Sequence, residues 1–217
     1  MSISASRAPG RHSHTAAFLY TVLALALCAA PSLWAQARHG MTDLSSITRV
    51  VDSMAPRSGP VGTDVNLRAM SMPAITPVRL GFGAATGFEE LGMLLTTETG
   101  ALTVGAKVPE WATWDRSYRF IVFDVYFRPI ALSDPFYVTN QEGMVLREGT
   151  VRRPATSCVT LTQMNGETIT LVGDTASLTN DVRVAVEGTV VGPSAAPCPA
   201  GVTIRITRVR ARGAPLR

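Results

Sequence analysis

The chain has 217 residues, of which 46% are hydrophobic and 17% are charged, with 20 basic and 16 acidic side chains. This composition supports a buried core and excludes an intrinsically disordered chain. The 18 glycines and 14 prolines favour short strands joined by turns over long helices. The length allows one domain or two.

The first 37 residues have the order of parts of a secretory signal peptide. Arg7 and Arg11 precede an apolar run over residues 16–30, and Ala35 and Ala37 supply the small residues of a cleavage site. We therefore expect a mature protein that begins after residue 37 and is exported to the periplasm or the cell surface. The alternative is an uncleaved anchor, but the run is shorter than the ~20 residues of a membrane span.

A second alternative is a lipoprotein cut before Cys28. The preceding residues resemble a bacterial lipobox, although that pattern has a small residue where Leu27 stands. Removal of residues 1–37 takes away two of the 20 basic residues and none of the 16 acids, which leaves a net charge near +2. The charge is therefore weak evidence for an acidic partner. No later stretch has the length of a spanning helix, so we expect no transmembrane segment in the mature chain.

Residues 45–139 contain seven short stretches rich in apolar and β-branched residues, each bounded by turn residues. This pattern is typical of β-strands, and about seven strands in such a length is the count of an immunoglobulin-like sandwich. The predicted strands are 47–51, 65–67, 78–82, 91–95, 102–108, 118–127 and 136–138.

Two motifs at the start of this region resemble a known family. Residues 47–50 (ITRV) and 56–65 (PRSGPVGTDV) are similar to the opening of IPT/TIG domains, in which a first strand is followed by P-x-S-G-P-x-G-T and a second strand. Residues 133–138 (SDPFYV) agree with the end of that family's pattern. The resemblance implies an immunoglobulin-like fold. It departs from the family over residues 83–100 and at Trp114, where the family usually has glycine.

Residues 143–212 contain five further strand patterns. Two of them, over 168–172 and 182–188, alternate apolar and polar residues with a period of two. Asn165-Gly166 predicts a two-residue hairpin between the second and third strands. Five short antiparallel strands in seventy residues indicate a small barrel of the OB type. The predicted strands are 144–152, 158–163, 168–172, 182–191 and 202–209.

This second region also resembles a group of small uncharacterised exported bacterial domains with an OB-like pattern. The shared features are Glu-Gly-Thr-Val at 148–151, the hairpin sequence at 171–174 and the Val-x-Val-x-Gly strand at 184–188. Cys158 and Cys198 stand where that pattern has its two cysteines. The resemblance brings no known activity.

Cys158 and Cys198 are an even pair in the mature chain. An exported protein meets an oxidising compartment, so we expect them to form a disulfide, which would contribute about 4 kcal/mol in the chain-entropy model. The alternative is two buried free thiols. Two cysteines without further ligands at suitable spacing do not make a metal site, and we expect none.

The residues give little support for catalysis. His12, His14 and His39 all precede the expected domains, which excludes His-dependent triads and metal sites there. Glu89 and Glu90 are neighbours and would point to opposite faces of a strand, so they cannot act as an acid/base pair. We expect no catalytic residue and no cofactor. Asp174 and Asp181 flank a loop that could chelate calcium, although turn formation is the simpler interpretation.

Two candidate ligand surfaces remain. The OB-like pattern suggests nucleic acid, but residues 140–217 contain no Phe, Trp or Tyr, which single-strand binders use for base stacking, so we expect no nucleic-acid partner. Trp111 and Trp114 lie in a polar loop and would form a platform for sugar rings or a protein partner. The alternative is that both pack against the sandwich edge or the second domain.

The sequence thus predicts a signal peptide, an IPT/TIG-like sandwich (45–139) and an OB-like barrel (143–212). The expected function is a non-catalytic binding or structural module of the bacterial envelope, with an unknown envelope protein or polysaccharide as partner. The alternative is an accessory subunit of a hydrolase, or a carboxylate-only glycoside hydrolase acting on envelope polysaccharide. That alternative requires two acids facing one cleft.

Overall fold

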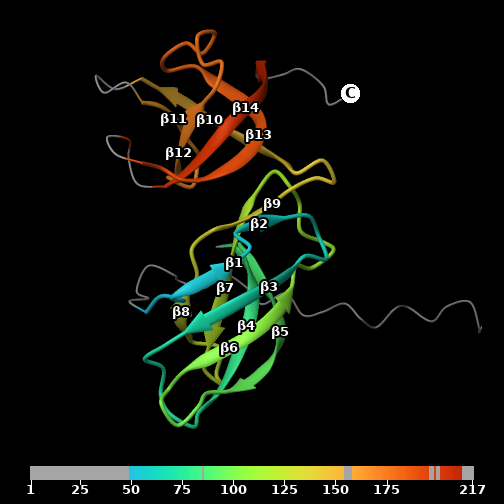
Figure 1. Cartoon of the computed structure of the whole chain (residues 1–217), viewed down its shortest axis with the longest axis vertical. Coiled ribbons are helices and arrows are strands. Elements are labelled where there is room, and N and C mark those ends of the chain that lie inside the picture. The colour runs from blue at the N-terminus through green and yellow to red at the C-terminus, as the bar shows by residue number, and fades with distance from the viewer. Residues whose placement is uncertain (1–48, 85, 154–157, 196–197, 199–200, 212–217) are drawn as a thin grey trace, which may run out of the picture. The chain divides into compact units, whose positions relative to one another are not determined.

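The structure is a computed structural model that describes residues 49–84, 86–153, 158–195, 198 and 201–211 (Figure 1). Every regular element in these ranges is a β-strand, so the all-β prediction is confirmed. The predictions of a signal peptide over residues 1–37 and of a lipid anchor at Cys28 fall outside the described residues. All described residues belong to one compact unit.

The first nine strands form two sheets, which together we call the two-sheet region. The smaller sheet has the order β1–β3–β6, and the larger has the order β2–β9–β7–β4–β5 with β8 paired to β7. The smaller sheet consists of β1 (Ser53–Ala55), β3 (Asp64–Ala69) and β6 (Leu102–Lys107). The larger consists of β2 (Ser58–Gly59), β4 (Pro77–Ala84), β5 (Gly87–Leu95), β7 (Ser117–Phe123), β8 (Pro129–Leu132) and β9 (Phe136–Val138).

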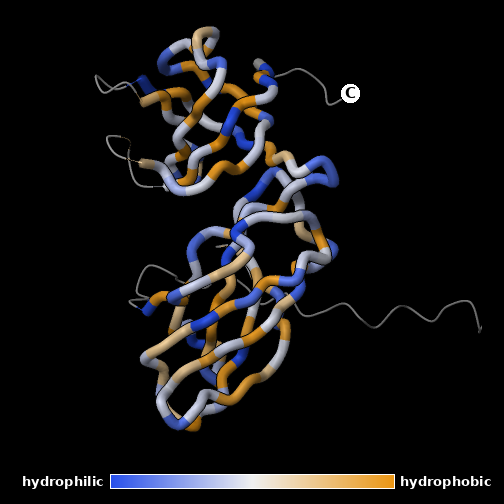
Figure 2. The backbone as a smooth tube through the Cα atoms, viewed as in Figure 1, coloured by the Kyte–Doolittle hydropathy of each residue, from blue (hydrophilic) through white to orange (hydrophobic). Residues whose placement is uncertain are grey.

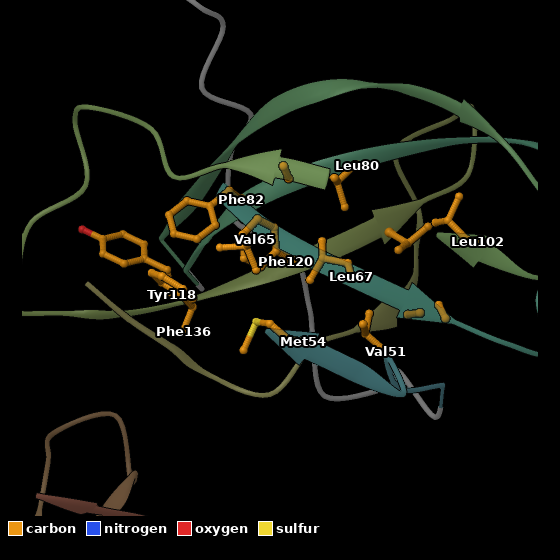
Figure 3. Close-up of a cluster of buried hydrophobic side chains, with 14 of the residues drawn as sticks. Val51, Met54, Val65, Leu67, Leu80, Phe82, Leu102, Tyr118, Phe120 and Phe136 are labelled. Carbon is orange, nitrogen blue, oxygen red and sulfur yellow. The ribbon is translucent and has the colours of Figure 1, made fainter. Parts of the chain in front are cut away.

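Side chains from both sheets fill one core (Figure 3). Val65 and Leu67 of β3 are buried and alternate with exposed neighbours, the period of a strand with one face inward. Phe82 of β4 and Phe120 of β7 are fully buried, with ring centroids 4.8 Å apart, and Phe136 of β9 packs edge-on against both. This region is therefore stabilised by a large aromatic cluster at its centre.

The predicted turn between the first strands is present. The Thr63 amide donates a hydrogen bond to the Pro60 carbonyl at 3.2 Å, and Gly62 has a φ of +80°, which L side chains rarely adopt. A Cβ on Gly59 would lie 2.5 Å from the Thr63 hydroxyl oxygen. The motif of residues 56–65 thus uses Gly62 for its backbone conformation and Gly59 for the close approach of the Thr63 side chain.

The predicted strand 118–127 is wrong in its second half, because the chain turns after Phe123. The Asp124 carboxylate accepts hydrogen bonds from the amides of Tyr126 at 2.8 Å and Arg128 at 2.9 Å. These bonds hold a tight turn, and β8 then pairs back onto β7. One turn-forming aspartate within an aromatic and β-branched run gave too weak a signal to end the strand.

The predicted strand 47–51 is also wrong where the structure describes it. From Arg49 onward this segment makes a single bridge, between Val50 and Leu132, and the first strand is β1. The predicted strand 91–95 is longer than expected and begins at Gly87.

The last five strands close into a barrel of order β10–β11–β12–β14–β13, in which β13 pairs back to β10. All pairs are antiparallel except β12 with β14. The five predicted strands are all found, with ends that differ by two residues at most. Their bounds are β10 (Met144–Arg152), β11 (Val159–Thr162), β12 (Thr168–Val172), β13 (Arg183–Pro193) and β14 (Val202–Ala211).

The barrel core is aliphatic. Hydrophobic and hydrophilic residues alternate along its strands (Figure 2), and Val145, Leu161, Ile169 and Ile204 are fully buried. The cluster includes one aromatic residue, Tyr137, which comes from β9 of the two-sheet region. The barrel core is thus completed by a side chain from outside the barrel.

Cys158 and Cys198 form a disulfide, as predicted, with their Cα atoms 5.5 Å apart. The bond joins the residue before β11 to the connection between β13 and β14. It closes a segment with a sequence separation of 40 residues, so two loops of the barrel are held together covalently.

The hairpin at Asn165-Gly166 exists, but its loop is longer than the predicted two residues. Gln163 and Glu167 are joined by a backbone hydrogen bond, which leaves three residues in the loop, and Gly166 has a φ of +83°. A three-residue loop with glycine in the left-handed region is the next most common hairpin type. The dipeptide therefore predicted the turn correctly and its length incorrectly.

Candidate functional site

A tight turn connects the two-sheet region to the barrel. The Asn140 side-chain oxygen accepts hydrogen bonds from the amides of Glu142 at 3.0 Å and Met144 at 2.9 Å, and Gly143 has a φ of +77°. The amide of Thr139 donates to the Gly59 carbonyl at 2.9 Å. The connection between the regions is therefore an ordered turn and not a flexible linker.

Arg147 of β10 is fully buried at the junction of the two regions. Its guanidinium donates to the carbonyls of Trp114 at 2.7 Å, Arg116 at 3.0 Å and Leu146 at 2.6 Å, and lies over the Tyr137 ring at 5.3 Å. Two of these carbonyls belong to the loop before β7. One barrel side chain thus holds a loop of the two-sheet region, and the charge-assisted hydrogen bonds partly offset the cost of burying it.

Glu167, at the end of the β11–β12 hairpin, makes the matching contact from the barrel. Its carboxylate accepts hydrogen bonds from the Tyr137 hydroxyl and the Ser117 hydroxyl, both at 2.6 Å, and from the Gln163 amide group at 3.0 Å. Tyr137 and Ser117 are on β9 and β7, so Glu167 links the barrel to two strands of the larger sheet.

At this junction the Tyr137 hydroxyl stays protonated as a hydrogen-bond donor and Arg147 stays charged. Burial and the negative charge of Glu167 raise the pKa of the Tyr137 hydroxyl well above its ordinary value of 10.0, so the phenol remains a donor. Burial lowers the pKa of the Arg147 guanidinium, while the charges of Glu167 and Tyr137 oppose that shift. A guanidinium stays protonated in proteins, so Arg147 remains a buried cation.

A cleft of about 450 Å³ lies beside this junction. Its size falls in the range of small-ligand sites, roughly 300–1,000 Å³. The two-sheet region contributes Arg57, Arg119, Asp134, Pro135 and Tyr137 to the lining, and the barrel contributes Glu167, Thr168, Val190, Gly192, Pro193, Gly201 and Val202. A site walled by both regions exists only when they are held together.

The charged groups of the cleft differ in how they are paired. Arg57 and Asp134 form an ion pair at 3.1 Å, and both side chains are more than half exposed. Arg119 donates through Nη1 to the Ser133 carbonyl, a neutral acceptor. Among the described residues, no carboxylate lies within ion-pair distance of Arg119, so its charge is not neutralised by direct contact.

The two predicted platform residues lie in the loop before β7, and both are partly buried. The Trp111 ring packs against Phe82 and, edge-on, against Tyr118, and its indole nitrogen donates to Glu89. Trp114 offers its carbonyl to Arg147 and to the Leu146 amide. The ring of Trp111 thus packs against the core of the two-sheet region, and the backbone of Trp114 attaches its loop to the barrel. Their role as a ligand platform stays a prediction.

The remaining acids have structural partners. Glu89 is buried beside Trp111, whereas Glu90 forms an ion pair with Arg79 at 2.6 Å. Because these two partners belong to different faces of the sheet, the neighbouring glutamates point apart, as predicted.

Asp174 and Asp181 also have local partners. The Asp174 carboxylate accepts the Ala176 amide at 3.3 Å, and Asp181 pairs with Arg152. These contacts agree with the turn interpretation of the two aspartates. In the described ranges, no group of three His, Cys, Asp or Glu side chains is arranged to hold a metal ion.

Sequence reasoning missed Arg147, Glu167 and the cleft. One signal was available for Arg147: it has the same phase in β10 as Val145, Gly149 and Val151, all of which point inward. A charged residue at an inward position of an alternating strand indicates a buried ion with partners elsewhere. No comparable signal exists for Glu167, which follows a turn.

Within the described part of the chain, no helix is long and apolar enough to cross a membrane. A comparison with models of known protein families and with curated proteins finds no match to this chain.

Proposed function

We propose that this protein is a non-catalytic binding module exported to the bacterial envelope, with its ligand site in the cleft between the two-sheet region and the barrel. The observation that carries the proposal is the cleft of about 450 Å³, whose two walls are joined by Arg147 and Glu167. Because the walls are fixed to each other, the site is formed before a ligand arrives, which lowers the entropic cost of binding.

The proposed domain types are an IPT/TIG-like immunoglobulin fold and an OB-like barrel. Two facing sheets around one core and the glycine turn at residues 56–65 support the first. A closed five-stranded barrel with one parallel pair supports the second. Neither fold specifies a ligand. The absence of Phe, Trp and Tyr from residues 140–217 argues against a nucleic-acid partner.

Export is supported by the Cys158–Cys198 disulfide, since disulfides persist in oxidising compartments. The order of parts in residues 1–37 supports it independently. The test is an intact mass of the protein exported by a Gram-negative host, with and without reduction and alkylation. We expect a chain that starts after residue 37 and takes two alkyl groups only after reduction. A lipid-modified start at Cys28 would indicate a membrane-tethered form, and an uncut chain with two free thiols would contradict export.

The cleft is tested with a substitution that fills it. Thr168 lines the cleft at the start of β12, so Thr168→Trp should block it, whereas Thr103→Trp at an exposed position of β6 outside the cleft is the matched control. Envelope glycans and peptides are screened for a shift in the melting temperature of the wild type. We expect each ligand that shifts it to shift the melting temperature of Thr103→Trp by the same amount and to leave that of Thr168→Trp unchanged. Ligands that stabilise Thr168→Trp as well as the wild type would place binding outside the cleft.

A carboxylate-only glycoside hydrolase is the second candidate, because Asp134 and Glu167 both line the cleft. Their contacts argue against it. Glu167 accepts three hydrogen bonds and Asp134 is paired with Arg57, so both carboxylates already have partners within the protein. Release of reducing sugar from envelope polysaccharide by the wild type, abolished in Glu167→Gln, would establish the hydrolase instead.

A further inference from the structure

We infer that the cleft recognises a carboxylate group on its ligand, and that Arg119 is the residue that binds it. This inference rests on the proposed function and adds the chemical class of the ligand. Its starting point is the unequal pairing of the charged groups that line the cleft.

Arg119 is held rigidly where it lines the cleft. It lies on β7 between Tyr118 and Phe120, which point into the core, and its Nη1 donates to the Ser133 carbonyl. Ser133 is itself buried and fixed, because its hydroxyl accepts the Phe120 amide at 2.9 Å and its amide donates to the Phe120 carbonyl. A guanidinium anchored at one nitrogen keeps its remaining N–H groups free for a ligand, at little further cost in side-chain entropy.

The other charges of the cleft are already used. Arg57 is paired with Asp134, and Glu167 accepts bonds from Tyr137 and Ser117 while it faces the buried cation Arg147. The charge of Arg119 is therefore the one among the described lining residues that a ligand can neutralise without breaking an existing contact.

The acids of the cleft also limit the charge of the ligand. Asp134 and Glu167 add negative charge to the same walls, which repels a dianion such as a phosphate monoester more strongly than a monoanion. A carboxylate carries one charge, and its two oxygens match the planar N–H fork of arginine. The lining thus favours a carboxylate over a phosphate and over a neutral group.

Uronic acid sugars and the free C-termini of peptides both carry carboxylates and are the two sources tested. The probes are digalacturonic acid against neutral digalactose, and a short alanine peptide acid against its C-terminal amide, each titrated calorimetrically into the full chain. We expect the acid of one pair to bind and its neutral counterpart to bind at least about tenfold more weakly, since a charge-assisted hydrogen bond is worth roughly that or more. The pair that responds identifies the source.

The variants are Arg119→Gln, Arg119→Lys and the matched control Arg68→Gln, which removes an exposed arginine of β3 that does not line the cleft. We expect Arg119→Gln to weaken binding of the acid about tenfold or more and to reduce the salt dependence of binding. Arg119→Lys should recover part of the affinity because the charge returns without the fork. Arg68→Gln should change the affinity less than about threefold. Unfolding midpoints confirm that each variant is folded.

The outcomes separate this inference from the proposed function. Binding of neutral and acidic probes with equal affinity, lost in Thr168→Trp, would overturn the carboxylate inference and leave the cleft as the ligand site. Binding of the acids that survives Arg119→Gln would overturn the role of Arg119. If neither acid binds at millimolar concentration, the inference is wrong.

Discussion

The two-sheet region and the barrel are both all-β, but they bury different kinds of side chain. The two-sheet region packs Phe82, Tyr118, Phe120 and Phe136 into one core. The barrel core is aliphatic, and its one aromatic member, Tyr137, is supplied by β9. A small domain buries a smaller fraction of its surface, so it often needs an additional constraint.

The barrel has two such constraints. The Cys158–Cys198 disulfide joins two of its loops, and the contacts of Arg147 and Glu167 attach it to the larger sheet. The two-sheet region is therefore stabilised by its own core, whereas the barrel is also stabilised by a covalent bond and by contacts with its neighbour. A practical consequence is that Trp111 and Trp114 both belong to the two-sheet region and residues 140–217 contain no tryptophan, so the barrel itself is followed by amide hydrogen exchange.

The largest effect is expected in the aromatic core. Phe120→Ala removes a fully buried ring that touches Phe82 and Phe136, and should lower the free energy of unfolding by roughly 3–5 kcal/mol. Tryptophan fluorescence in urea measures it. The control, Leu161→Ala in the barrel core, should increase hydrogen exchange in β10–β14 more than it shifts the fluorescence transition. Equal shifts in both probes would mean that the two regions unfold as one unit.

Loss of the disulfide should act on the barrel. Replacement of Cys158 and Cys198 by alanine together should cost roughly 2–4 kcal/mol, because the unfolded segment between them regains its freedom. We expect faster hydrogen exchange in β11, β12 and β14, with little change in the tryptophan signal. If the fluorescence transition and the hydrogen exchange report the same loss in the free energy of unfolding, the two regions do not differ in their dependence on the disulfide.

Arg147→Met tests the attachment between the regions. The substitution keeps an unbranched side chain but removes the donor to the Arg116 carbonyl and leaves the Trp114 carbonyl with the Leu146 amide alone, so we expect a loss of roughly 2 kcal/mol. The fluorescence and exchange transitions should separate further than in the wild type. Arg152→Met removes an exposed arginine of the same strand and should cost less than about 0.5 kcal/mol. Similar losses in both variants would argue against a special role for Arg147.

The smallest effect is expected at the turn after β7, and it depends on pH. Burial raises the pKa of Asp124, but hydrogen bonds from Arg128 and Tyr126 outweigh that effect and bring it below its ordinary value of 3.8. A lowered folded pKa stabilises the fold above the unfolded value and loses that contribution as the pH falls through the folded value. Asp124→Asn should therefore cost about 1 kcal/mol at pH 7. In urea titrations at pH 7, 4 and 2, this difference should shrink toward the lowest pH; a constant difference would show that charge plays no part.

The sequence predicted the strands of the barrel because each reveals itself locally. Alternation over residues 168–172 and 182–188 predicted β12 and β13, and Gly62 marks a turn by its backbone requirement. The disulfide was predictable because residues 143–212 contain two cysteines. The strand over 118–127 was mispredicted for the same local reason, since only Asp124 interrupted its apolar pattern.

Tertiary structure alone decided the junction and the cleft. Glu167 bonds Ser117 and Tyr137 across 50 and 30 residues, and Arg147 reaches the Trp114 carbonyl across 33. A backbone carbonyl has the same chemistry at every position, so no pattern of residue types could identify it as the acceptor. The sequence by itself determined the five strands of the barrel and which cysteines pair. The packing of two separately patterned regions determined that Arg147 is buried, that Glu167 is occupied, and that Arg119 is left with an unpaired charge in a cleft.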